Sequence, residues 1–399
     1  MKILLLTPFL PYPPRATSKV RPFNWLKHLS AKHQISLVSF IDSAAEKGYA
    51  DQLRGYCRQV VTVLRKEKGG ILPRSLNLFQ KAPYFVVKQF QSAAMQEQAK
   101  RILSENEFDV IHAVSLAMTQ YAAGAEGASR VVEAVDCLTR NYLQQYRLPL
   151  GIRDRVLAYI DWTKMKRYEP AAFSCFDECI LANPTDKEFI RPLLPDTPVD
   201  VIPYGVDLDY FKPQGVDEEF PSLVFTGSMN YIPNADAVGY FCSEILPRIE
   251  KEYPGIKVYV LGRDDRGRIK RYIAGRKNVI YPGFVGDVRP FLSKASIFIC
   301  PLRMGTGIKN KVLEAMAMAK PLVSSSVGLE GIDLKDRESV LVADDPATFS
   351  RAVSELIADR GLRGRLGAEA RQVAERDHSW RMLAGRVDEV YSRIAGKRR

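Results

Sequence analysis

The sequence predicts an α/β protein of two domains, each a doubly wound parallel sheet with helices on its faces. The chain has 399 residues, which is too long for one ordinary hydrophobic core and suits two domains of roughly 100–200 residues each. Short β-branched or leucine-rich runs alternate with longer amphipathic stretches in both halves. This alternation is typical of parallel strands joined by crossover helices, so the same architecture is expected twice.

The apolar runs predict strands in each half of the chain. Those of the first half are Lys2–Leu6, Ile35–Phe40, Val60–Leu64, Val110–Ala113, Arg130–Val135, Glu178–Leu181 and Val199–Ile202. Those of the second half are Leu223–Thr226, Lys257–Leu261, Val279–Tyr281, Ile297–Cys300, Leu322–Ser325 and Val340–Val342. Two amphipathic stretches stand out as helices, Val86–Asn106 and Trp380–Ile394. The second has apolar residues at helical spacing, so it is expected to cover another surface.

Proline and glycine punctuate the segment Pro203–Pro213, which has no clear periodicity and is the predicted linker. We therefore expect an N-terminal domain over 1–205, a C-terminal domain over 214–375 and a final helical segment over 376–399. Open sheets of this kind bind ligands at the carboxyl ends of their strands. Two such sheets facing each other predict a ligand cleft between the domains.

The composition is that of a globular protein, since 46% of the residues are hydrophobic and 26% are charged. No stretch approaches the roughly 20 consecutive apolar residues that span a bilayer, and the apolar run after Met1 is too short for a signal peptide. A cytoplasmic protein is therefore expected. Six cysteines, of which only Cys175 and Cys179 are close in sequence, indicate reduced and mostly buried thiols rather than a zinc site.

The formal net charge of +12 favours anionic partners. Basic residues concentrate at Arg54–Arg74, Arg147–Arg167 and Lys397–Arg399, but stacking aromatics are not interleaved with them as in RNA-binding signatures. No nucleic-acid partner is therefore expected. Anionic lipid headgroups fit the charge equally well, and a solvated basic face is the alternative.

The stretch Arg147–Arg167 is also partly apolar. Its apolar members are Leu148, Leu150, Ile152, Val156, Leu157, Ile160 and Trp162. Such a surface predicts a peripheral location at the inner face of the cytoplasmic membrane, with packing of these residues into the core as the alternative.

Residues 297–316 predict a strand, a glycine loop and a helix that begins near Asn310. Two glycines and two lysines surround the start of this helix: Gly305, Gly307, Lys309 and Lys311. The glycines allow the backbone to approach a ligand closely, and the free N–H groups of the first helical turn favour an anion. With the two ammonium groups added, the segment predicts a site for a nucleotide diphosphate.

Glu314 lies one turn into the same helix and is predicted to accept hydrogen bonds from ribose hydroxyls. The alternative for the whole segment is a glycine-rich turn with solvated lysines and an ion pair between Lys311 and Glu314. A Walker A loop and a dinucleotide-binding fingerprint are excluded, because Gly-Lys-Ser/Thr and a third glycine are both missing.

At this segment the sequence resembles the GT-B nucleotide-sugar glycosyltransferases, in particular the large retaining group called family 4, of the kind found in bacterial exopolysaccharide and cell-surface sugar assembly. The resemblance covers nearly the whole chain. It is carried by Gly305–Glu314 with the following Ala315–Val323, and by four further segments in the expected order. These are Pro11–Pro14, Ile202–Asp207, Phe225–Met229 and Gly283–Asp287.

The resemblance implies a GT-B fold whose last helix packs back on the first domain. It also implies transfer of a hexosyl-type sugar from a nucleotide diphosphate sugar to a hydroxyl of a glycan or lipid-linked glycan, with retention of configuration. The implied donor-binding residues are Gly227, Ser228, Arg263, Phe284, Val285, Gly305, Thr306, Gly307, Lys309, Lys311 and Glu314. Among them, Phe284 and Val285 line the base pocket, and the two lysines hold the diphosphate.

The sequence departs from the family at three places. Thr306 stands where the family's first signature glutamate contacts the donor sugar. The loop Arg15–Lys19, after the first strand, lacks the expected glycines. The family's histidine has no clear match, and His112 is either a core residue of its strand or a replacement for it.

Asp136 follows an apolar run and is expected at the carboxyl end of a strand, where its carboxylate would orient the acceptor hydroxyl or the transferred sugar. Capping of the next helix is the alternative. We predict catalytic roles for Asp136 and for Lys311, which would stabilise the leaving diphosphate.

Asp207-Leu208-Asp209 matches the metal-binding motif of the other large glycosyltransferase fold but lies in the predicted linker. No metal and no other cofactor is expected, because lysines and a helix N-terminus can neutralise the diphosphate.

Two other functions share these features. A GT-B sugar-nucleotide 2-epimerase would bind the same ligand and need carboxylate acid and base groups but no acceptor. A non-catalytic protein that binds a sugar nucleotide or nucleic acid would be consistent with Thr306 and with the missing histidine.

Overall fold

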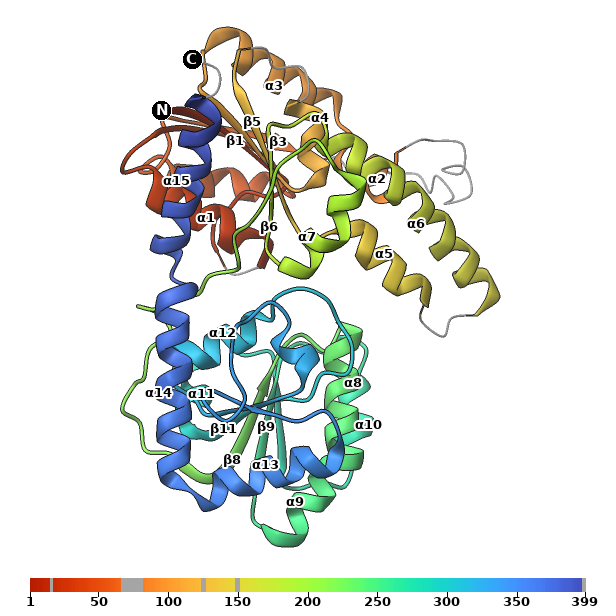
Figure 1. Cartoon of the computed structure of the whole chain (residues 1–399), viewed down its shortest axis with the longest axis vertical. Coiled ribbons are helices and arrows are strands. Elements are labelled where there is room, and N and C mark those ends of the chain that lie inside the picture. Colours follow the sequence, from red (N-terminus) through yellow and green to blue (C-terminus); the bar gives the residue numbers. More distant parts are fainter. Residues whose placement is uncertain (15–16, 66–81, 123–126, 148–150, 397–399) are drawn as a thin grey trace. The chain divides into compact units, whose positions relative to one another are not determined.

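The computed structural model describes residues 1–14, 17–65, 82–122, 127–147 and 151–396 (Figure 1). The chain divides into two compact units. Unit 1 comprises Met1–Pro203 and Leu383–Arg399, and unit 2 comprises Tyr204–Met382. The chain thus returns at its end to the unit in which it begins.

Unit 1 contains a parallel sheet with the order β3-β2-β1-β4-β5-β6-β7 over its described residues. The strands are β1 (Lys2–Thr7), β2 (Gln34–Ile41), β3 (Gln59–Leu64), β4 (Val110–Val114), β5 (Ser129–Val135), β6 (Glu178–Leu181) and β7 (Val199–Val201). Every residue of β4 and β6 is buried, as expected for a parallel sheet covered on both faces. The order reverses between β1 and β4.

The helices of unit 1 connect these strands, and the last one comes from the end of the chain. They are α1 (Thr17–Leu29), α2 (Tyr84–Phe90), α3 (Ala93–Glu105), α4 (Thr119–Ala122), α5 (Leu138–Arg147), α6 (Ile152–Phe173), α7 (Pro184–Ile190) and α15 (Trp380–Gly396). Figure 1 shows α5 and α6 as a helical hairpin that extends away from the sheet of unit 1.

The predicted single helix Val86–Asn106 is wrong, because the chain breaks between α2 and α3. Ser92 caps α3 by accepting a hydrogen bond from the backbone N–H of Met95 at 3.3 Å. The hydroxyl of Tyr121 fills the break: it accepts from the N–H of Ser92 and donates to the carbonyl of Phe90. These bonds satisfy backbone groups that a continuous helix would have paired internally.

A buried polar network lies in the core of unit 1. Arg21 and Trp25 both donate hydrogen bonds to the carboxylate of Glu133, and the Nε2 atom of His112 lies 3.3 Å from the same carboxylate. The other ring nitrogen of His112 is 2.5 Å from the hydroxyl of Tyr391 on α15. His112 is therefore a buried core residue that links the sheet to the last helix.

Unit 2 contains a second parallel sheet, with the order β10-β9-β8-β11-β12-β13. Its strands are β8 (Glu219–Thr226), β9 (Lys257–Leu261), β10 (Val279–Gly283), β11 (Ala295–Cys300), β12 (Leu322–Ser324) and β13 (Leu341–Val342). All of β11 is buried. Here the order reverses between β8 and β11.

The helices of unit 2 follow the same alternation. They are α8 (Ile232–Tyr240), α9 (Leu246–Glu252), α10 (Arg268–Ile273), α11 (Arg289–Lys294), α12 (Asn310–Ala317), α13 (Pro346–Ala358) and α14 (Arg360–Asp377). Each predicted strand of both halves overlaps a strand of the structure. The predicted fold class, two doubly wound parallel-sheet units, is confirmed.

The predicted linker Pro203–Pro213 begins where unit 2 begins. The ring of Tyr204 packs against Trp380 with ring centroids 5.5 Å apart, and its carbonyl lies 2.7 Å from a ring nitrogen of His378. Gly205 makes room for this packing, since a Cβ atom there would lie 2.5 Å from the indole of Trp380. These contacts fix the start of unit 2 against its own last residues.

The cysteines are free thiols, and all except the exposed Cys175 are buried, as predicted. No helix within the described residues is both long and apolar enough to cross a membrane. The predicted basic segments Arg54–Arg74 and Lys397–Arg399 fall partly or wholly outside the described residues, as does part of the loop Arg15–Lys19.

Candidate functional site

The candidate site of unit 2 lies at the reversal of its strand order. β8 and β11 are neighbours, and the chain continues from β8 to β9 on one side and from β11 to β12 on the other. The loops that follow two such strands separate and leave a crevice at their carboxyl ends, which is where open α/β sheets bind ligands. The glycine loop leads from β11 into α12, and residues 227–231 lead from β8 into α8.

Lys311, on α12, is held at this point by side chains of β8 and α8. Its Nζ atom donates a hydrogen bond to the side-chain oxygen of Asn234 and lies 4.1 Å from the centroid of the Phe225 ring. The amide nitrogen of Asn234 donates in turn to the carbonyl of Ser228 at 2.8 Å, which aims the amide oxygen at Lys311. Burial lowers the pKa of Lys311 to about 8.

Gly227 permits this arrangement. A Cβ atom at this position would lie 2.7 Å from both the Lys311 Nζ and the Asn234 side-chain nitrogen, and the residue has φ +151°. Gly262, after β9, packs on it so closely that a Cβ there would lie 1.8 Å from the carbonyl oxygen of Gly227. Two glycines thus bring two strand-end loops together around one ammonium group.

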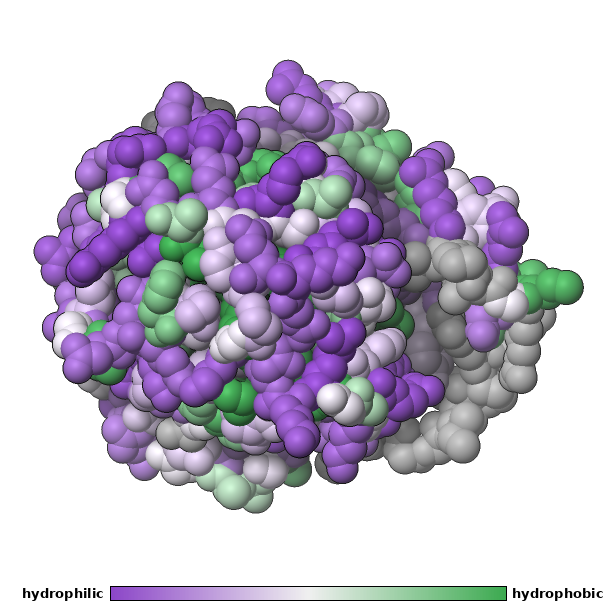
Figure 2. Space-filling view, turned by 90° about the horizontal axis from the view of Figure 1, so that it is seen from below, coloured by the Kyte–Doolittle hydropathy of each residue, from purple (hydrophilic) through white to green (hydrophobic). Residues whose placement is uncertain are grey.

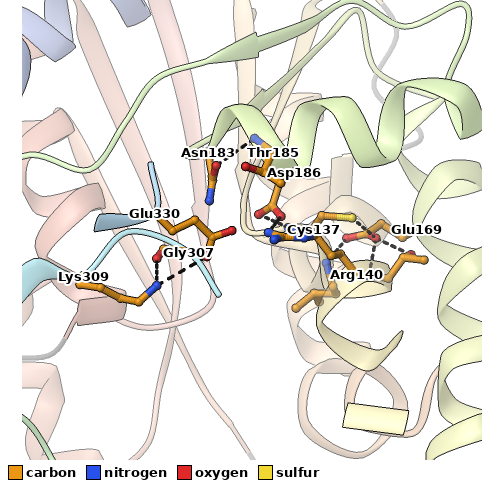
Figure 3. A network of polar contacts seen from close by, with 11 residues as sticks. Cys137, Arg140, Glu169, Asn183, Thr185, Asp186, Gly307, Lys309 and Glu330 are labelled. Atoms are coloured by element: carbon orange, nitrogen blue, oxygen red, sulfur yellow. Dashed lines mark hydrogen bonds and ion pairs between the residues drawn. The ribbon is translucent and has the colours of Figure 1, made fainter. Parts of the chain in front are cut away.

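Lys309 has a different environment from Lys311. It is only 8% exposed, its Nζ donates to the carbonyl of Gly307, and it lies 3.6 Å from the carboxylate of Glu330 (Figure 3). The alternative of solvated lysines is therefore wrong. Glu330 was not among the predicted site residues.

The glycine loop needs its glycines for conformation. Gly305 has φ +122° and Gly307 has φ +74°, values that side chains with a Cβ atom rarely adopt. Thr306 lies between them and is half-buried. Lys309 is the N-cap residue of α12, and its side chain makes no capping hydrogen bond.

Glu314 lies one turn after Lys311 on α12 and is half-buried. Burial raises the pKa of its carboxyl to about 7, although the charge of Lys311 opposes the shift. Burial thus lowers the pKa of an ammonium group and raises the pKa of a carboxyl group on one turn of α12.

The other predicted donor residues lie on the loops after β8, β9 and β10. The guanidinium of Arg263 lies 5.4 Å from the centroid of the Phe284 ring, which is 69% exposed. The carbonyl of Arg263 accepts a hydrogen bond from Met229 at 2.7 Å, which ties the first two loops together. Ser228 is exposed and Val285 is half-buried. All the predicted donor-binding residues therefore lie at the carboxyl edge of one sheet or on α12.

In unit 1, Asp136 follows β5 directly and is half-buried. The start of the next helix, for which Asp136 is the predicted alternative cap, also has a carboxylate partner from another element. Glu169 of α6 is buried and accepts hydrogen bonds from the N–H groups of Leu138 and Thr139 and from the Thr139 hydroxyl (Figure 3). The helix start is thus stabilised by a carboxylate that sequence patterns did not indicate.

Asp186 of α7 completes this cluster of unit 1. It accepts from the N–H of Cys137 at 3.1 Å and from the guanidinium of Arg140 at 2.8 Å. Asn183 precedes the helix and caps it by accepting from the N–H of Thr185 (Figure 3). Only this last residue had a sequence signal, since asparagine followed by proline commonly begins a helix.

The Asp207-Leu208-Asp209 motif has a structural role. The Asp207 carboxylate accepts hydrogen bonds from the N–H groups of Asp209 and Tyr210 and so stabilises a turn. Within the described part of the chain, no group of three histidine, cysteine, aspartate or glutamate side chains is arranged to hold a metal ion.

Part of the second half of the chain matches a known family model. Residues 220–359 match the family model described as "Glycosyl transferases group 1". The matched segment contains the Lys311 site and the Lys309–Glu330 pair.

The relatives match only part of the chain. It is 26% identical over 150 residues to an uncharacterised protein from the cps region of Klebsiella pneumoniae. This match covers 36% of this chain and 39% of the relative. The chain is 30% identical over 131 residues to the lipopolysaccharide core biosynthesis glycosyltransferase LpsE of Rhizobium meliloti, which covers 31% and 36%. The matches thus span well under half the length of these relatives.

Solved structures match over the whole chain. Sucrose-phosphate synthase from Thermosynechococcus elongatus has a TM-score of 0.72 at 15% identity and covers 100% of both chains. HepE of Anabaena in complex with UDP has a TM-score of 0.69 at 13% identity and covers 99% of this chain and 100% of its own. Residues 220–359 therefore match a group 1 glycosyl transferase domain, within a chain that has the GT-B fold of these solved structures.

Proposed function

We propose that the protein transfers a hexosyl-type sugar from a nucleoside diphosphate sugar to a hydroxyl of a glycan or lipid-linked glycan. The observation that carries the proposal is Lys311, which Asn234 and Gly227 hold at the reversal of the strand order within the matched family segment. A cation held beside the start of a helix suits a leaving diphosphate, whose negative charge grows as the bond to the sugar breaks.

The donor binds along the carboxyl edge of the unit 2 sheet in this proposal. Lys311 and the first N–H groups of α12 bind the diphosphate, and Glu314 accepts hydrogen bonds from the ribose. The nucleobase lies against Phe284, whose exposed ring already carries the Arg263 guanidinium. The solved HepE structures contain UDP and UDP-glucose, which supports a uridine nucleotide as the first donor to test.

The reaction proceeds with retention and without a metal ion in this proposal. A donor-phosphate oxygen takes the proton of the acceptor hydroxyl, the hydroxyl oxygen forms the new bond to the sugar, and the diphosphate leaves with the bonding electrons. Lys311 neutralises the diphosphate, and no cation is required. Asp136 of unit 1 orients the acceptor hydroxyl or the transferred sugar.

The acceptor is proposed to be a glycan under assembly at the inner face of the cytoplasmic membrane, to which the protein binds peripherally. The name of the LpsE relative, which refers to lipopolysaccharide core biosynthesis, supports an acceptor of this class. The net charge of +12 suits an anionic membrane surface.

The first test is a thermal-shift panel of nucleoside diphosphates and their sugars, with and without a chelator. A ligand at about 100 times its Kd adds about 2.7 kcal/mol, which raises Tm by roughly 5–10 °C in a domain of about 150–250 residues. The expected result is a shift with one nucleotide that the chelator does not change. No shift with any nucleotide would contradict the proposed donor site.

Turnover is tested next with the nucleotide sugar that the panel selects. Release of the nucleoside diphosphate should require an acceptor or occur slowly by hydrolysis, and NMR of the product should show the anomeric configuration of the donor. Inversion would contradict the retaining mechanism. If the donor is converted to an epimer in the absence of an acceptor, the protein is an epimerase and the proposed transfer reaction is wrong.

A further inference from the structure

α6 has two different faces. Its buried face consists of Ala158, Asp161, Met165, Glu169 and Phe173, which all lie against unit 1. Its first three turns expose apolar side chains on another face: Ile152 is 87% exposed, Val156 is 53% exposed and Tyr159 is 48% exposed. The spacing of four and then three residues places these three side chains in one stripe along the helix.

An aromatic cluster adjoins this stripe. Tyr146, at the end of α5, stacks on Trp162 with ring centroids 6.0 Å apart and planes inclined by 5°. The ring of Tyr159 lies 5.5 Å from Tyr146 and 5.9 Å from Trp162. Arg155 lies 5.6 Å from the centroid of Tyr146, and Lys166 lies 5.8 Å from the centroid of Trp162.

The surroundings of the stripe are basic. The stretch 147–167 contains six arginines and lysines against two aspartates, and one of these, Asp161, is buried. Arg155, Lys166 and Arg167 are exposed. In Figure 2, hydrophobic atoms stand out at the edge of the molecule on the side where Figure 1 shows the α5–α6 hairpin. The face thus combines exposed apolar and aromatic groups with an excess of cationic groups over the one exposed aspartate, Asp154.

We propose that this face of the α5–α6 hairpin docks on a membrane that contains anionic lipids. Ile152 and Val156 enter the boundary between headgroups and acyl chains, Tyr159 lies at the interface, and Arg155 and Lys166 bind lipid phosphates. Helices that lie in a membrane interface combine these groups in this way, because aromatic side chains prefer the interface and cations are attracted to anionic headgroups. The inference rests on the proposed function in one respect: the membrane is the place where the protein would bind a lipid-linked acceptor.

Co-sedimentation with lipid vesicles tests the docking. Wild-type protein should bind phosphatidylcholine vesicles that contain phosphatidylglycerol, bind weakly to phosphatidylcholine alone, and dissociate at high salt. The double variant Ile152→Asp/Val156→Asp should bind at least about tenfold more weakly. Arg155→Gln and Lys166→Gln should each weaken binding about fivefold, and only to the anionic vesicles.

The control is Val216→Asp, which adds the same charge at a valine that is 52% exposed outside the hairpin. It should bind vesicles like the wild type. Equal vesicle binding by the wild type and the Ile152→Asp/Val156→Asp variant, or no binding by either, overturns the inference. A dimer in sedimentation equilibrium that this variant dissociates, without any vesicle binding, also overturns it and assigns the face to a second copy.

These experiments distinguish a failure of the membrane-docking inference from a failure of the proposed function. Vesicle binding uses no donor or acceptor, and the thermal shift with a nucleotide uses no lipid. The Ile152→Asp/Val156→Asp variant should keep the nucleotide-dependent shift of the wild type, which also shows that it is folded. Loss of vesicle binding with this shift retained is the result expected from the inference.

Discussion

The ammonium group of Lys311 donates a hydrogen bond to the side-chain oxygen of Asn234, which lies 77 residues earlier in the chain. The bond joins α12 to α8, the helices that follow the neighbouring strands β11 and β8. It places one ammonium group at the reversal of the strand order, with a neutral amide as its hydrogen-bond partner. Lys309, which lies near the carboxylate of Glu330, is the contrasting case.

Replacement of Lys311 by methionine should abolish most donor binding and leave the protein at least as stable. The charge-assisted hydrogen bonds that it would make to a diphosphate are each worth roughly 1.5–3 kcal/mol, so Kd for the nucleoside diphosphate should rise by about tenfold to a hundredfold. The Tm of the free protein should not fall, because burial disfavours the ammonium group. Calorimetric titration and thermal unfolding measure both. Lys270→Met, at an exposed lysine of α10, is the control; equal loss of affinity in both variants contradicts the assignment.

Donor affinity should fall at alkaline pH. The pKa of Lys311 is about 8 in the free protein, and a bound diphosphate favours the protonated form and raises this pKa. Between the two pKa values the affinity should fall about tenfold per pH unit. A nucleotide sugar is the proper ligand, because its diphosphate has no ionisation near neutrality. A flat profile from pH 7 to 9.5 would show that Lys311 does not bind the diphosphate.

Glu314 should add an acidic limb to the same profile. Burial raises its pKa to about 7, and only the ionised carboxylate accepts hydrogen bonds from two ribose hydroxyls with both oxygens. Affinity should therefore decrease as the pH falls below about 7. In Glu314→Gln the affinity should be lower at pH 8 and independent of pH on this side. Persistence of the acidic limb in the variant would assign it to another group.

Gly227→Ala should weaken donor binding without unfolding the protein. The new Cβ would lie 2.7 Å from the Lys311 Nζ and from the Asn234 amide nitrogen. Both side chains must therefore move away from position 227. We expect Kd for the nucleotide to rise at least about tenfold, as for loss of a well-placed charged group. Gly255→Ala, where a Cβ meets nothing within 4 Å, is the matched control. Unchanged affinity in Gly227→Ala would show that the close approach is not needed for binding.

Glu133 should make unit 1 sensitive to acid. Burial alone would raise its pKa, but the charge of Arg21 and the bonds from His112 and Trp25 lower it to about 2, below the ordinary value of 4.5. Because the folded value is the lower one, the stabilisation is present above about pH 4.5 and is lost as the pH falls toward 2. Glu133→Gln should cost about 3–5 kcal/mol at pH 7 by leaving Arg21 without its carboxylate.

Urea unfolding from pH 7 to pH 3 measures this effect. The difference in unfolding free energy between wild type and Glu133→Gln should shrink as the pH falls. Glu107→Gln, at an exposed glutamate of unit 1, should change little at any pH. A constant difference between wild type and Glu133→Gln would argue against an ionised Glu133.

The strands were predictable because parallel strands covered on both faces are continuous apolar runs. The ends of the strands were less predictable. β8 begins at Glu219, but the prediction began at Leu223, because Pro221 and Ser222 interrupt the apolar pattern of the sequence. The break between α2 and α3 depends on the hydroxyl of Tyr121, a distant residue that no local pattern brings to Ser92.

The candidate site was predictable only where one segment carries it. Glycines 305 and 307, the lysines and Glu314 lie within ten residues of each other, and the loop requires the glycines for positive φ angles. Asn234 and Glu330 were missed because each acts on a lysine through the fold, and neither stands in a periodic or glycine-rich pattern. The side chains that contact a motif from elsewhere in the chain can be identified only from the structure.

The return of the chain to unit 1 has a consequence for synthesis. Tyr391 reaches the buried His112 from the last helix, and all of Tyr204–Met382 is made between the two parts of unit 1. At roughly 5–20 residues per second, a ribosome needs on the order of ten to forty seconds for that interval. The half of the protein that is translated first is therefore the last to be completed, and the nascent first half must stay soluble while its closing helix has yet to be made.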